Sequence, residues 1–383
     1  MQSKEFGTSM SISRRRFLSF TAKGTAAIGT GVAAVGGGLM YSQSASTAQH
    51  WLISASTDKS GNHYAAAYRL NGELVSRVKL PARGHDIIAH PFKSGHAIVF
   101  ARRPGQYFIE VDFNHGEVVK QVSPQVGSHF YGHGIGNQQV LITTENNYQQ
   151  GRGAIVVRDI NTYQVLEQFD SGGIGPHQLA YMPDNKLIVI ANGGILTHPD
   201  QPRKKLNLES MKPNLAYMEL ESGKVVDSFE LDNHQLSIRH LDVSEKGKVV
   251  AGLQYQGAKS DLVPLAIAHH GEASLQYLSA SEDIWRRMNH YTASVCIDNA
   301  ANLVAISCPR ADMLTYWSLN DNSFIAKERF SDGAGLAMST DGKGIVATSG
   351  KGQILPIGQA NNQASIFVDG IKFDNHLGYL TVS

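Results

Sequence analysis

The sequence predicts an all-β protein, a seven-bladed β-propeller, and three observations support this prediction. Short strands recur with a period of 44–50 residues wherever no insertion intervenes. Turns such as Asp-Gly, Asn-Gly and Ser-Gly separate the strands, and no long stretch shows the apolar spacing of a helix. The two ends of the chain supply complementary parts of one further repeat.

The N-terminal part of the folded chain supplies three strands that lack the first strand of a blade, at 51–58, 64–72 and 73–81. The C-terminal segment 374–383 is a lone first strand. We therefore expect one C-terminal strand and three N-terminal strands to form the closing blade, which removes exposed sheet edges. A single domain over 49–383 then holds seven blades of about 48 residues each.

Between the two ends, the blades follow one another along the chain. Blade three shows four strands most clearly, at 177–184, 186–194, 214–223 and 224–232. Its second and third strands are separated by an insertion at 195–213, which we expect to project over the mouth of the central channel as a lid. The basic and imidazole side chains of this insertion are His198, Arg203, Lys204 and Lys205. Blades five and six follow at 290–332 and 335–373.

Six histidines recur where the first strand of a blade begins. They are His85, His133, His177, His240, His290 and His376. Their spacings are 48, 44, 63, 50 and 86 residues; the third contains the insertion, and the last contains one blade without the histidine, around Ala334. Because first strands line a propeller's channel, the six imidazoles are predicted to meet at one axis. Neutral imidazoles favour transition metals, so we predict a metal site there, with iron or copper as the ion.

Several residues near these histidines admit two interpretations. A single hub histidine is commonly structural, hydrogen-bonded to the backbone of a neighbouring blade, whereas six at equivalent positions have no obvious structural benefit. Asp86 and Asp374 either orient an imidazole or are ordinary turn residues. Asn289 competes with His290 for the hub position, and His129 either supports the site or lies on the surface.

The N-terminus has the pattern of an export signal. Paired arginines, Arg14 and Arg15, are followed by Phe17, Leu18 and a weakly apolar, Gly-rich stretch. A small-residue cleavage site lies near Ala48, so residues 1–48 are interpreted as a twin-arginine signal peptide that directs the folded protein to the periplasm. The alternative is a retained anchor, but the stretch is poorly hydrophobic for a stable membrane span.

Charge and motifs exclude several function classes. Residues 1–48 hold five Lys and Arg and one acid, so the remaining chain carries 29 basic and 32 acidic residues and is not expected to bind nucleic acid. No nucleophile elbow, phosphate loop, paired cysteine ligands or haem-attachment motif is present. Cys296 and Cys308 are expected to be buried thiols rather than a disulfide. Arg102-Arg103 either binds a carboxylate or phosphate or belongs to an ordinary loop.

The segments LPARGHD, HFYGHG, GIGPHQL, ANGGILTHPD and DNHLGY, with others between them, resemble a family of bacterial twin-arginine-exported proteins of unknown function. The resemblance covers 50–383, and its run from Gly173 to Met211 is the most specific part. It implies a periplasmic role in iron or copper handling beside imelysin-type iron-uptake proteins. Family members often carry a cysteine in blade six where this chain has Ala334, so a thiolate ligand is absent here.

These observations favour a periplasmic propeller that binds a transition metal through its hub histidines and takes part in iron or copper acquisition or redox handling. Two alternatives stay open. One is a metal-dependent oxidoreductase or hydrolase with its site at the channel mouth. The other is a protein-interaction scaffold without metal, in which the histidines are structural and the insertion at 195–213 docks a partner.

Overall fold

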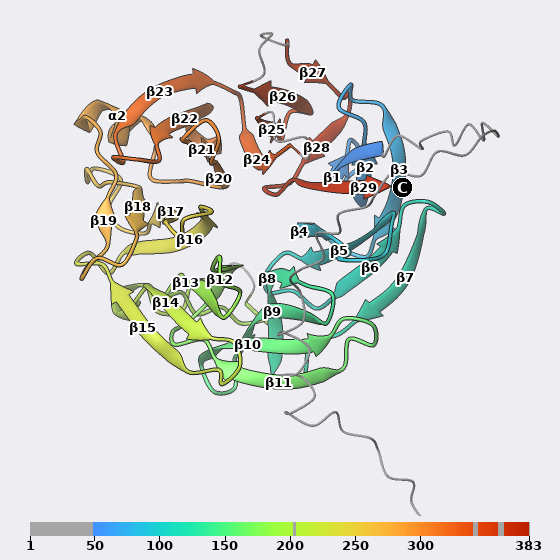
Figure 1. Cartoon of the computed structure of the whole chain (residues 1–383), viewed down its shortest axis with the longest axis horizontal. Helices are drawn as coiled ribbons and strands as arrows, with labels where there is room; N and C mark the ends of the chain where they lie inside the picture. Colours follow the sequence, from blue (N-terminus) through green and yellow to red (C-terminus); the bar gives the residue numbers. More distant parts are fainter. Residues whose placement is uncertain (1–48, 202–203, 340–343, 359–363, 383) are drawn as a thin grey trace, which may run out of the picture. The chain divides into compact units, whose positions relative to one another are not determined.

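The computed structural model describes residues 49–201, 204–339, 344–358 and 364–382. These residues form seven antiparallel sheets that lie around a central axis as the blades of a propeller (Figure 1), which confirms the predicted fold class. The proposed signal segment 1–48 lies outside the described residues. Within the described ranges, no helix has the length and apolar character that crossing a bilayer requires.

Blades one to four follow the chain from the inner strand to the outer strand. Blade one contains β4 (Gly84–Ala89), β5 (His96–Ala101), β6 (Phe108–Asp112) and β7 (Glu117–Val122). Blade two contains β8 (Ser128–Gly136), β9 (Val140–Asn147), β10 (Arg152–Asp159) and β11 (Val165–Asp170). Blade three contains β12 (Pro176–Tyr181), β13 (Leu187–Asn192), β14 (Asn214–Glu219) and β15 (Val225–Glu230). Blade four contains β16 (Leu236–Val243), β17 (Val249–Tyr255), β18 (Ala266–His269) and β19 (Gln276–Tyr277).

Blades five and six have the same order, with short helices in some of their connections. Blade five contains β20 (Val295–Asp298), β21 (Leu303–Cys308), β22 (Met313–Ser318) and β23 (Phe324–Arg329). Blade six contains β24 (Gly333–Met338), β25 (Ile345–Ser349), β26 (Gln353–Ile357) and β27 (Ile366–Phe367). The helical segments are η1 (Leu208–Ser210), α2 (Glu282–Arg287) and η2 (Pro309–Ala311).

Blade seven joins the two ends of the domain. Its N-terminal part is β1 (Gln49–Asp58), β2 (His63–Tyr68) and β3 (Leu74–Leu80). Both C-terminal strands, β28 (Ile371–Phe373) and β29 (Gly378–Val382), pair antiparallel with β1. The closure by both ends is therefore as predicted, although the C-terminal contribution is two short strands instead of one continuous strand. Residues 374–377 lie between these strands at the channel.

The apolar core lies between neighbouring blades. Ile53 and Val78 of blade seven pack in one cluster with Ile87, Val99 and Ile109 of blade one. The outer strands are different, because each has no further strand at its outer edge and most of its residues are exposed. These strands are β7, β11, β15 and β23. Apolar burial therefore holds blade against blade, which leaves the inner strands free to carry polar groups at the axis.

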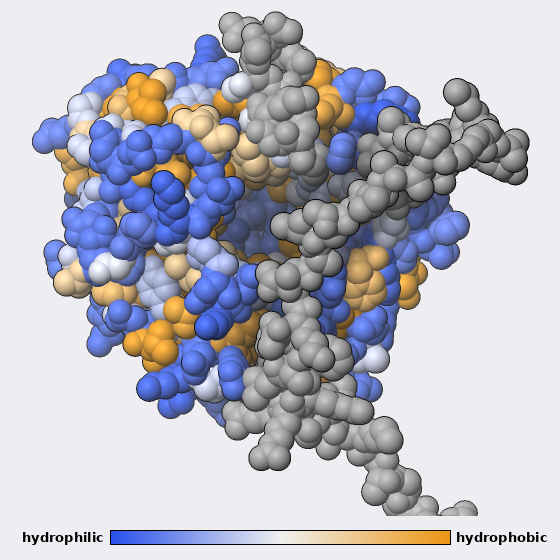
Figure 2. Space-filling view, in the orientation of Figure 1, coloured by the Kyte–Doolittle hydropathy of each residue, from blue (hydrophilic) through white to orange (hydrophobic). Residues whose placement is uncertain are grey.

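The centre of the ring is polar. Figure 2 shows a hollow there, with hydrophilic residues on much of its visible rim. Away from the axis, Cys296 and Cys308 are both free and buried, as expected. Burial raises the pKa of the Cys308 thiol to about 12, so this cysteine has no reactive thiolate at neutral pH.

Candidate metal centre

The hub histidines sit in irregularities of the inner strands. Pairing of β4 with β5 shifts register between Gly84 and Ile87, on either side of His85. Equivalent shifts occur between Phe130 and Gly134, between Pro176 and Leu179, and between Ile238 and Leu241. These enclose His133, His177 and His240, while His376 lies in the gap between β28 and β29. A β-bulge re-aims a side chain out of the ordinary alternation, and here it turns each imidazole toward the axis.

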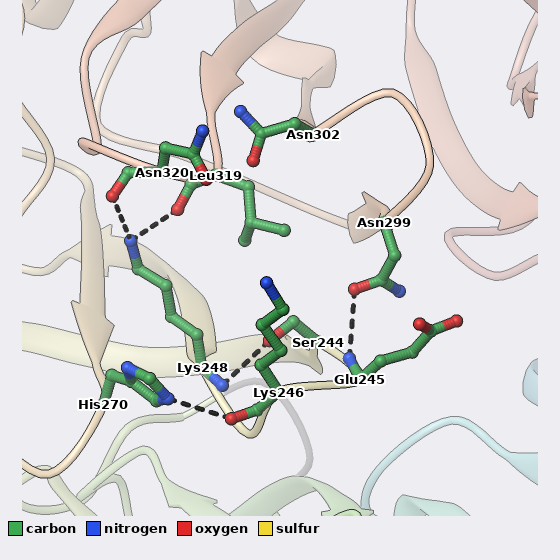
Figure 3. Close-up of a pocket in the computed structure, with 9 residues that line it drawn as sticks. All are labelled: Ser244, Glu245, Lys246, Lys248, His270, Asn299, Asn302, Leu319 and Asn320. Atoms are coloured by element: carbon green, nitrogen blue, oxygen red, sulfur yellow. Dashed lines mark hydrogen bonds between the residues drawn. The ribbon is translucent and has the colours of Figure 1, made fainter.

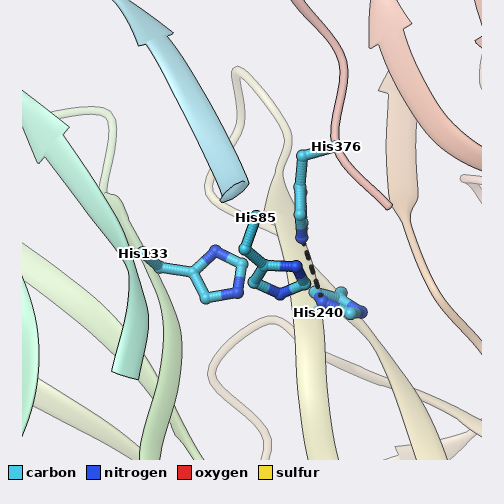
Figure 4. A group of neighbouring side chains, drawn as sticks. All are labelled: His85, His133, His240 and His376. Carbon is cyan, nitrogen blue, oxygen red and sulfur yellow. Dashed lines mark hydrogen bonds between the residues drawn. The ribbon is translucent and has the colours of Figure 1, made fainter. Parts of the chain in front are cut away.

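Five imidazoles from five blades form one compact group, four of which are drawn in Figure 4. The centroids of the His133 and His177 rings are 4.5 Å apart, and those of His177 and His240 are 4.6 Å apart. His376 lies 4.8 Å from His240, and His85 closes the group at 4.7 Å from His376 and 4.9 Å from His133. All five residues are buried. The structure therefore brings five of the six predicted residues together.

The nitrogen atoms at the centre are spaced as ligands of one ion are spaced. The Nε2 atom of His240 lies 2.9 Å from that of His177 and 3.2 Å from that of His376. Two nitrogens bound to one ion at about 2.0–2.1 Å would be about 2.8–3.4 Å apart. Hydrogen bonding does not account for both contacts, because a neutral imidazole nitrogen offers either one N–H or one lone pair.

A second grouping of ring nitrogens involves four of the five histidines. One nitrogen from each lies within 4.8 Å of the other three, and the members are His85, His133, His240 and His376. His177 is outside this set but in contact with it through His240. Neutral nitrogen donors in this number suit Zn, Cu, Fe or Ni rather than ions that prefer hard oxygen ligands.

Two buried carboxylates lie beside three of the imidazoles. Asp374 Oδ1 lies 3.0 Å from His85 Nδ1, and its Oδ2 accepts a bond from Arg83 Nε. Asp86 Oδ2 lies 3.3 Å from His133 Nδ1, and its Oδ1 lies 3.8 Å from His376 Nδ1. Carboxylates on Nδ1 fix the ring orientation and leave Nε2 directed at a metal. The orienting interpretation thus fits Asp374, which is hydrogen-bonded to His85, whereas Asp86 lies near His133 and His376.

The electrostatic environment favours the neutral form of four of the imidazoles. Burial lowers the pKa of His85, His177 and His240 well below its ordinary value of 6.5, and neighbouring histidine and arginine charges lower it further. Burial, with the charge of His133, lowers the pKa of His376 to about 4. Burial alone would raise the pKa of Asp86, but its contacts with His133 and His376 lower it to about 2. At neutral pH these four imidazoles offer uncharged nitrogens beside the ionised carboxylate of Asp86.

His290 is not part of this group. Its backbone has φ 57° and precedes β20, and its Nε2 lies 2.8 Å from the carbonyl oxygen of Asp261. The centroid of its ring is 5.4 Å from that of Tyr255, away from the axis. The prediction of a sixth hub imidazole is therefore wrong at this residue, because its side chain lies against Asp261 and Tyr255 instead of at the axis.

Blades five and six place small residues where the others place histidine. The Thr144 hydroxyl lies 3.2 Å from the carbonyl oxygens of both His133 and His177. The Ser307 hydroxyl makes the same two contacts to Ser294 and Ala334, at 3.5 and 2.7 Å. Ser294 and Ala334 are therefore the hub residues of these two blades, and the ring of imidazoles is open on their side.

His129 lies inside the protein, so its surface interpretation is wrong. Its Nδ1 lies 3.1 Å from the carbonyl oxygen of Phe130, and its ring stacks on Tyr131 with centroids 5.5 Å apart. The Tyr131 ring meets the edge of His177 at 6.4 Å. His129 therefore supports the wall of the site without reaching the cluster.

A cavity of about 300 Å³ adjoins the cluster on the axis. It is lined by residues that follow the histidines in the inner strands, among them Asp86, Gln178, Ser294 and Leu336, and by His376. A metal at the cluster would therefore have room for a small molecule beside it. A second cavity, of about 250 Å³, lies near the turns of blades four and five (Figure 3). Its Lys248 Nζ and His270 Nε2 contact backbone carbonyls.

Sequence reasoning missed one functional residue, Arg239. It immediately precedes His240 and is only 3% exposed, although it carries a guanidinium group. The signal was present in the sequence, since a charged residue beside a hub histidine in a strand of apolar neighbours requires an explanation.

Comparison with known proteins agrees with this fold and leaves the activity open. The family model described as "Protein of unknown function (DUF1513)" matches residues 78–380, and the chain belongs to this family. No curated protein matches it. Among solved structures it is similar to Kuenenia stuttgartiensis hydrazine synthase, with 13% identity, a TM-score of 0.56, and coverage of 82% of this chain and 94% of that chain. It is also similar to the Dos1 propeller, with 15% identity, a TM-score of 0.50, and coverage of 78% and 75%.

Proposed function

We propose that this protein is a periplasmic transition-metal-binding propeller that takes part in iron or copper acquisition or redox handling. The observation that carries the proposal is the convergence of Nε2 atoms from His177, His240 and His376 at 2.9 and 3.2 Å. Neutral imidazoles held by a rigid ring of blades would bind an ion without first losing protons. The twin-arginine pattern of residues 1–48 supports export of a folded protein, and the family resemblance supports imelysin-type partners.

The structural interpretation of the hub histidines fits poorly with their contacts. Four histidines elsewhere in the described chain contact backbone carbonyls, namely His129, His269, His270 and His290, while His96 and His115 contact carboxylates. The hub differs because its imidazoles also contact one another, at 2.9 Å between His177 and His240 and at 3.2 Å between His240 and His376. The Nδ1 atom of His177 and the Nδ1 atom of His240 are each buried without a hydrogen-bond partner among the described residues. Such groups each cost about 1–3 kcal/mol, so stability alone does not explain the cluster.

A metal-dependent enzyme is the second candidate, and the axial cavity favours it. This space of about 300 Å³ places Asp86 and Gln178 beside His376. When bound, a transition metal would supply Lewis-acid or redox chemistry there. Asp86 would remain ionised and accept a proton or a hydrogen bond from a molecule in the cavity. Turnover of a small substrate, dependent on Asp86, would distinguish this function from metal carriage.

The test is metal analysis by mass spectrometry on protein isolated from its native periplasm, beside a variant in which His133, His177 and His240 are changed to alanine. We expect near-stoichiometric iron or copper in the wild type and none in the variant. A matched control is Ser294→Ala, which changes a hub residue without removing an imidazole. Absence of bound metal in the wild type, with no uptake of copper or iron in either oxidation state, would overturn the proposal and favour the scaffold alternative.

A further inference from the structure

The hub contains a buried cation with no counter-ion. Arg239, in the register shift of β16, is 3% exposed, and its Nε and Nη1 atoms have no hydrogen-bond partner among the described residues. Guanidinium groups in a protein interior are strongly destabilising unless an anion neutralises them. The fold nevertheless keeps this one, which indicates that an anion completes the site.

The fold also makes room beside this side chain. An added Cβ atom at Gly193 would lie 2.7 Å from Arg239 Nη1, so only glycine lets the guanidinium occupy its place between blades three and four. The Ser237 hydroxyl donates to the Gly193 carbonyl at 2.6 Å and fixes the two inner strands at this point. The position of the guanidinium is therefore built into both blades.

Further cations surround Arg239. Burial is the main cause that lowers the pKa of Arg239, and the charges of Arg103 and Arg102 lower it further. The resulting pKa of about 9 leaves Arg239 charged at neutral pH. Burial, followed by the charges of Arg239, Arg103 and Arg310, lowers the pKa of Lys205. Arg103 is half-buried, whereas Arg102, Lys205 and Arg310 are exposed. None of these five side chains forms an ion pair with a carboxylate of the described residues.

This cationic group adjoins the histidine cluster. The charge of Arg239 lowers the pKa of both His177 and His240. For His177 it is the largest cause after burial. Arg103 donates from Nη1 to the Tyr131 hydroxyl at 3.1 Å, and the Tyr131 ring lies 6.4 Å from that of His177. An anion held by Arg239 would therefore lie next to the imidazoles.

We propose that Arg239, with Arg102, Arg103 and Lys205 around it, binds a small polycarboxylate at the channel mouth beside the histidine cluster. Planar guanidinium groups pair with carboxylates through two parallel hydrogen bonds, and several cations in one place favour a ligand with several carboxylates. The half-buried Tyr291 provides aromatic surface for an organic anion, and the guanidinium of Arg310 lies 4.1 Å over its ring. This site goes beyond the proposed metal function and does not depend on it.

The experiment is calorimetric titration of citrate into the full-length, metal-free protein at low ionic strength, after any chelator has been dialysed away. We expect saturable citrate binding that weakens at least tenfold in Arg239→Gln. Arg152→Gln is the matched control, because Arg152 is exposed and paired with Asp170 on the outer part of blade two. If Arg239→Gln does not fold, the rim variant Arg102→Gln with Lys205→Gln should show the same loss.

Two outcomes would overturn the assignment. Equal citrate affinity in wild type, Arg239→Gln and the rim variant, or no binding at all, would mean that no anion site exists. Inorganic phosphate that binds as tightly as citrate would rule out a site built for polycarboxylates. His376→Ala separates the two sites, because it should lose metal and keep citrate binding. If the wild type binds citrate but never metal, the metal proposal fails and the anion site stands.

Discussion

Blades three and six use the same hub backbone and present different side chains. In blade three, a hydroxyl from the preceding blade contacts the carbonyl of His177, and in blade six the Ser307 hydroxyl makes the same contact to Ala334. Both residues lie within a register shift of the inner strand. One position carries an imidazole and the other a methyl group. The frame of the hub therefore does not depend on histidine.

The backbone of the hub forms with or without a histidine side chain. Small residues at the hub of blade six also let blade seven come close, since an added Cβ at Gly335 would lie 3.1 Å from the backbone of His376. Five imidazoles fit on an axis where seven would crowd. The histidines are thus additions to a hub that forms without them, and their removal should affect binding more than fold.

The largest expected effect is a loss of folding stability in acid, caused by the blades that carry a hub histidine and not by those that lack one. In the unfolded chain a histidine binds its proton near pH 6.5, whereas in the folded protein four hub histidines stay neutral at lower pH, down to about pH 4 for His376; the other three are His85, His177 and His240. Above pH 6.5 these histidines are neutral in both states and do not change the free energy of unfolding. Below pH 6.5 only the unfolded chain binds their protons, so the free energy of unfolding falls as the pH drops. Each contributes a loss of about 1.4 kcal/mol per pH unit. Urea unfolding of metal-free protein at pH 7.5, 6 and 5 measures this loss.

The matched variant for that experiment carries His177→Ser and His240→Ala, which makes blades three and four resemble blades five and six. We expect a clearly shallower pH dependence in this variant. An unchanged slope would show that other groups control acid unfolding.

Loss of an orienting carboxylate should weaken metal binding strongly. Asp374→Asn removes the negative charge that holds His85 Nδ1 at 3.0 Å and pairs with Arg83. Loss of such a partner typically lowers metal affinity by about 10- to 100-fold. Competition with a chromophoric chelator measures the affinity. Asp369→Asn is the control, because Asp369 is an exposed partner of Lys59, and a similar loss there would contradict a specific role.

Two glycines with positive φ should respond differently to alanine. Gly132 has φ +104°, and a Cβ atom there would lie 2.9 Å from His85 Cδ2, whereas Gly151 has φ +66° with no atom within 4 Å. Both changes cost about 1–2 kcal/mol in backbone strain. Only Gly132→Ala should also reduce metal affinity, because it displaces an imidazole. Thermal unfolding and metal titration of both variants test this, and equal affinities would contradict it.

The smallest expected effect concerns the hydroxyls that join neighbouring inner strands. Thr144→Val and Ser307→Ala each remove contacts to two hub carbonyls, at a cost of about 1 kcal/mol in unfolding free energy. Thr144→Val should also lower metal affinity measurably, since it releases the strand irregularities of His133 and His177. Ser307→Ala holds no imidazole in place and should leave metal affinity unchanged. Equal effects on metal would mean that these contacts do not position the ring.

Most of the architecture was predictable from the sequence, because period and turn chemistry are local properties. Strand repeats, the closing blade and five of the six hub residues follow from residue order alone. His290 shows the limit of this reasoning. It stands at the correct repeat spacing, yet its backbone at φ 57° turns the ring toward Tyr255 and Asp261. Spacing along the chain does not report which residue of a blade reaches the axis, and in blade five that residue is Ser294.

Which aspartate contacts which hub histidine could not be predicted from the sequence. Asp86 follows His85 but contacts His133 and His376, and Asp374 precedes His376 but contacts His85. Each carboxylate therefore serves a histidine of another blade. Arg239 was missed for the same reason, since the space that Gly193 leaves for it belongs to a neighbouring blade.

The sequence by itself determined a closed ring of seven blades and a row of histidines at its axis, because hydrophobic period and turn residues act within one repeat. The tertiary structure alone decided which imidazoles meet, which aspartates orient them, and that a buried guanidinium lies beside them. Such contacts join side chains 63, 136 and 289 positions apart, so only the folding of the ring brings them within bonding distance.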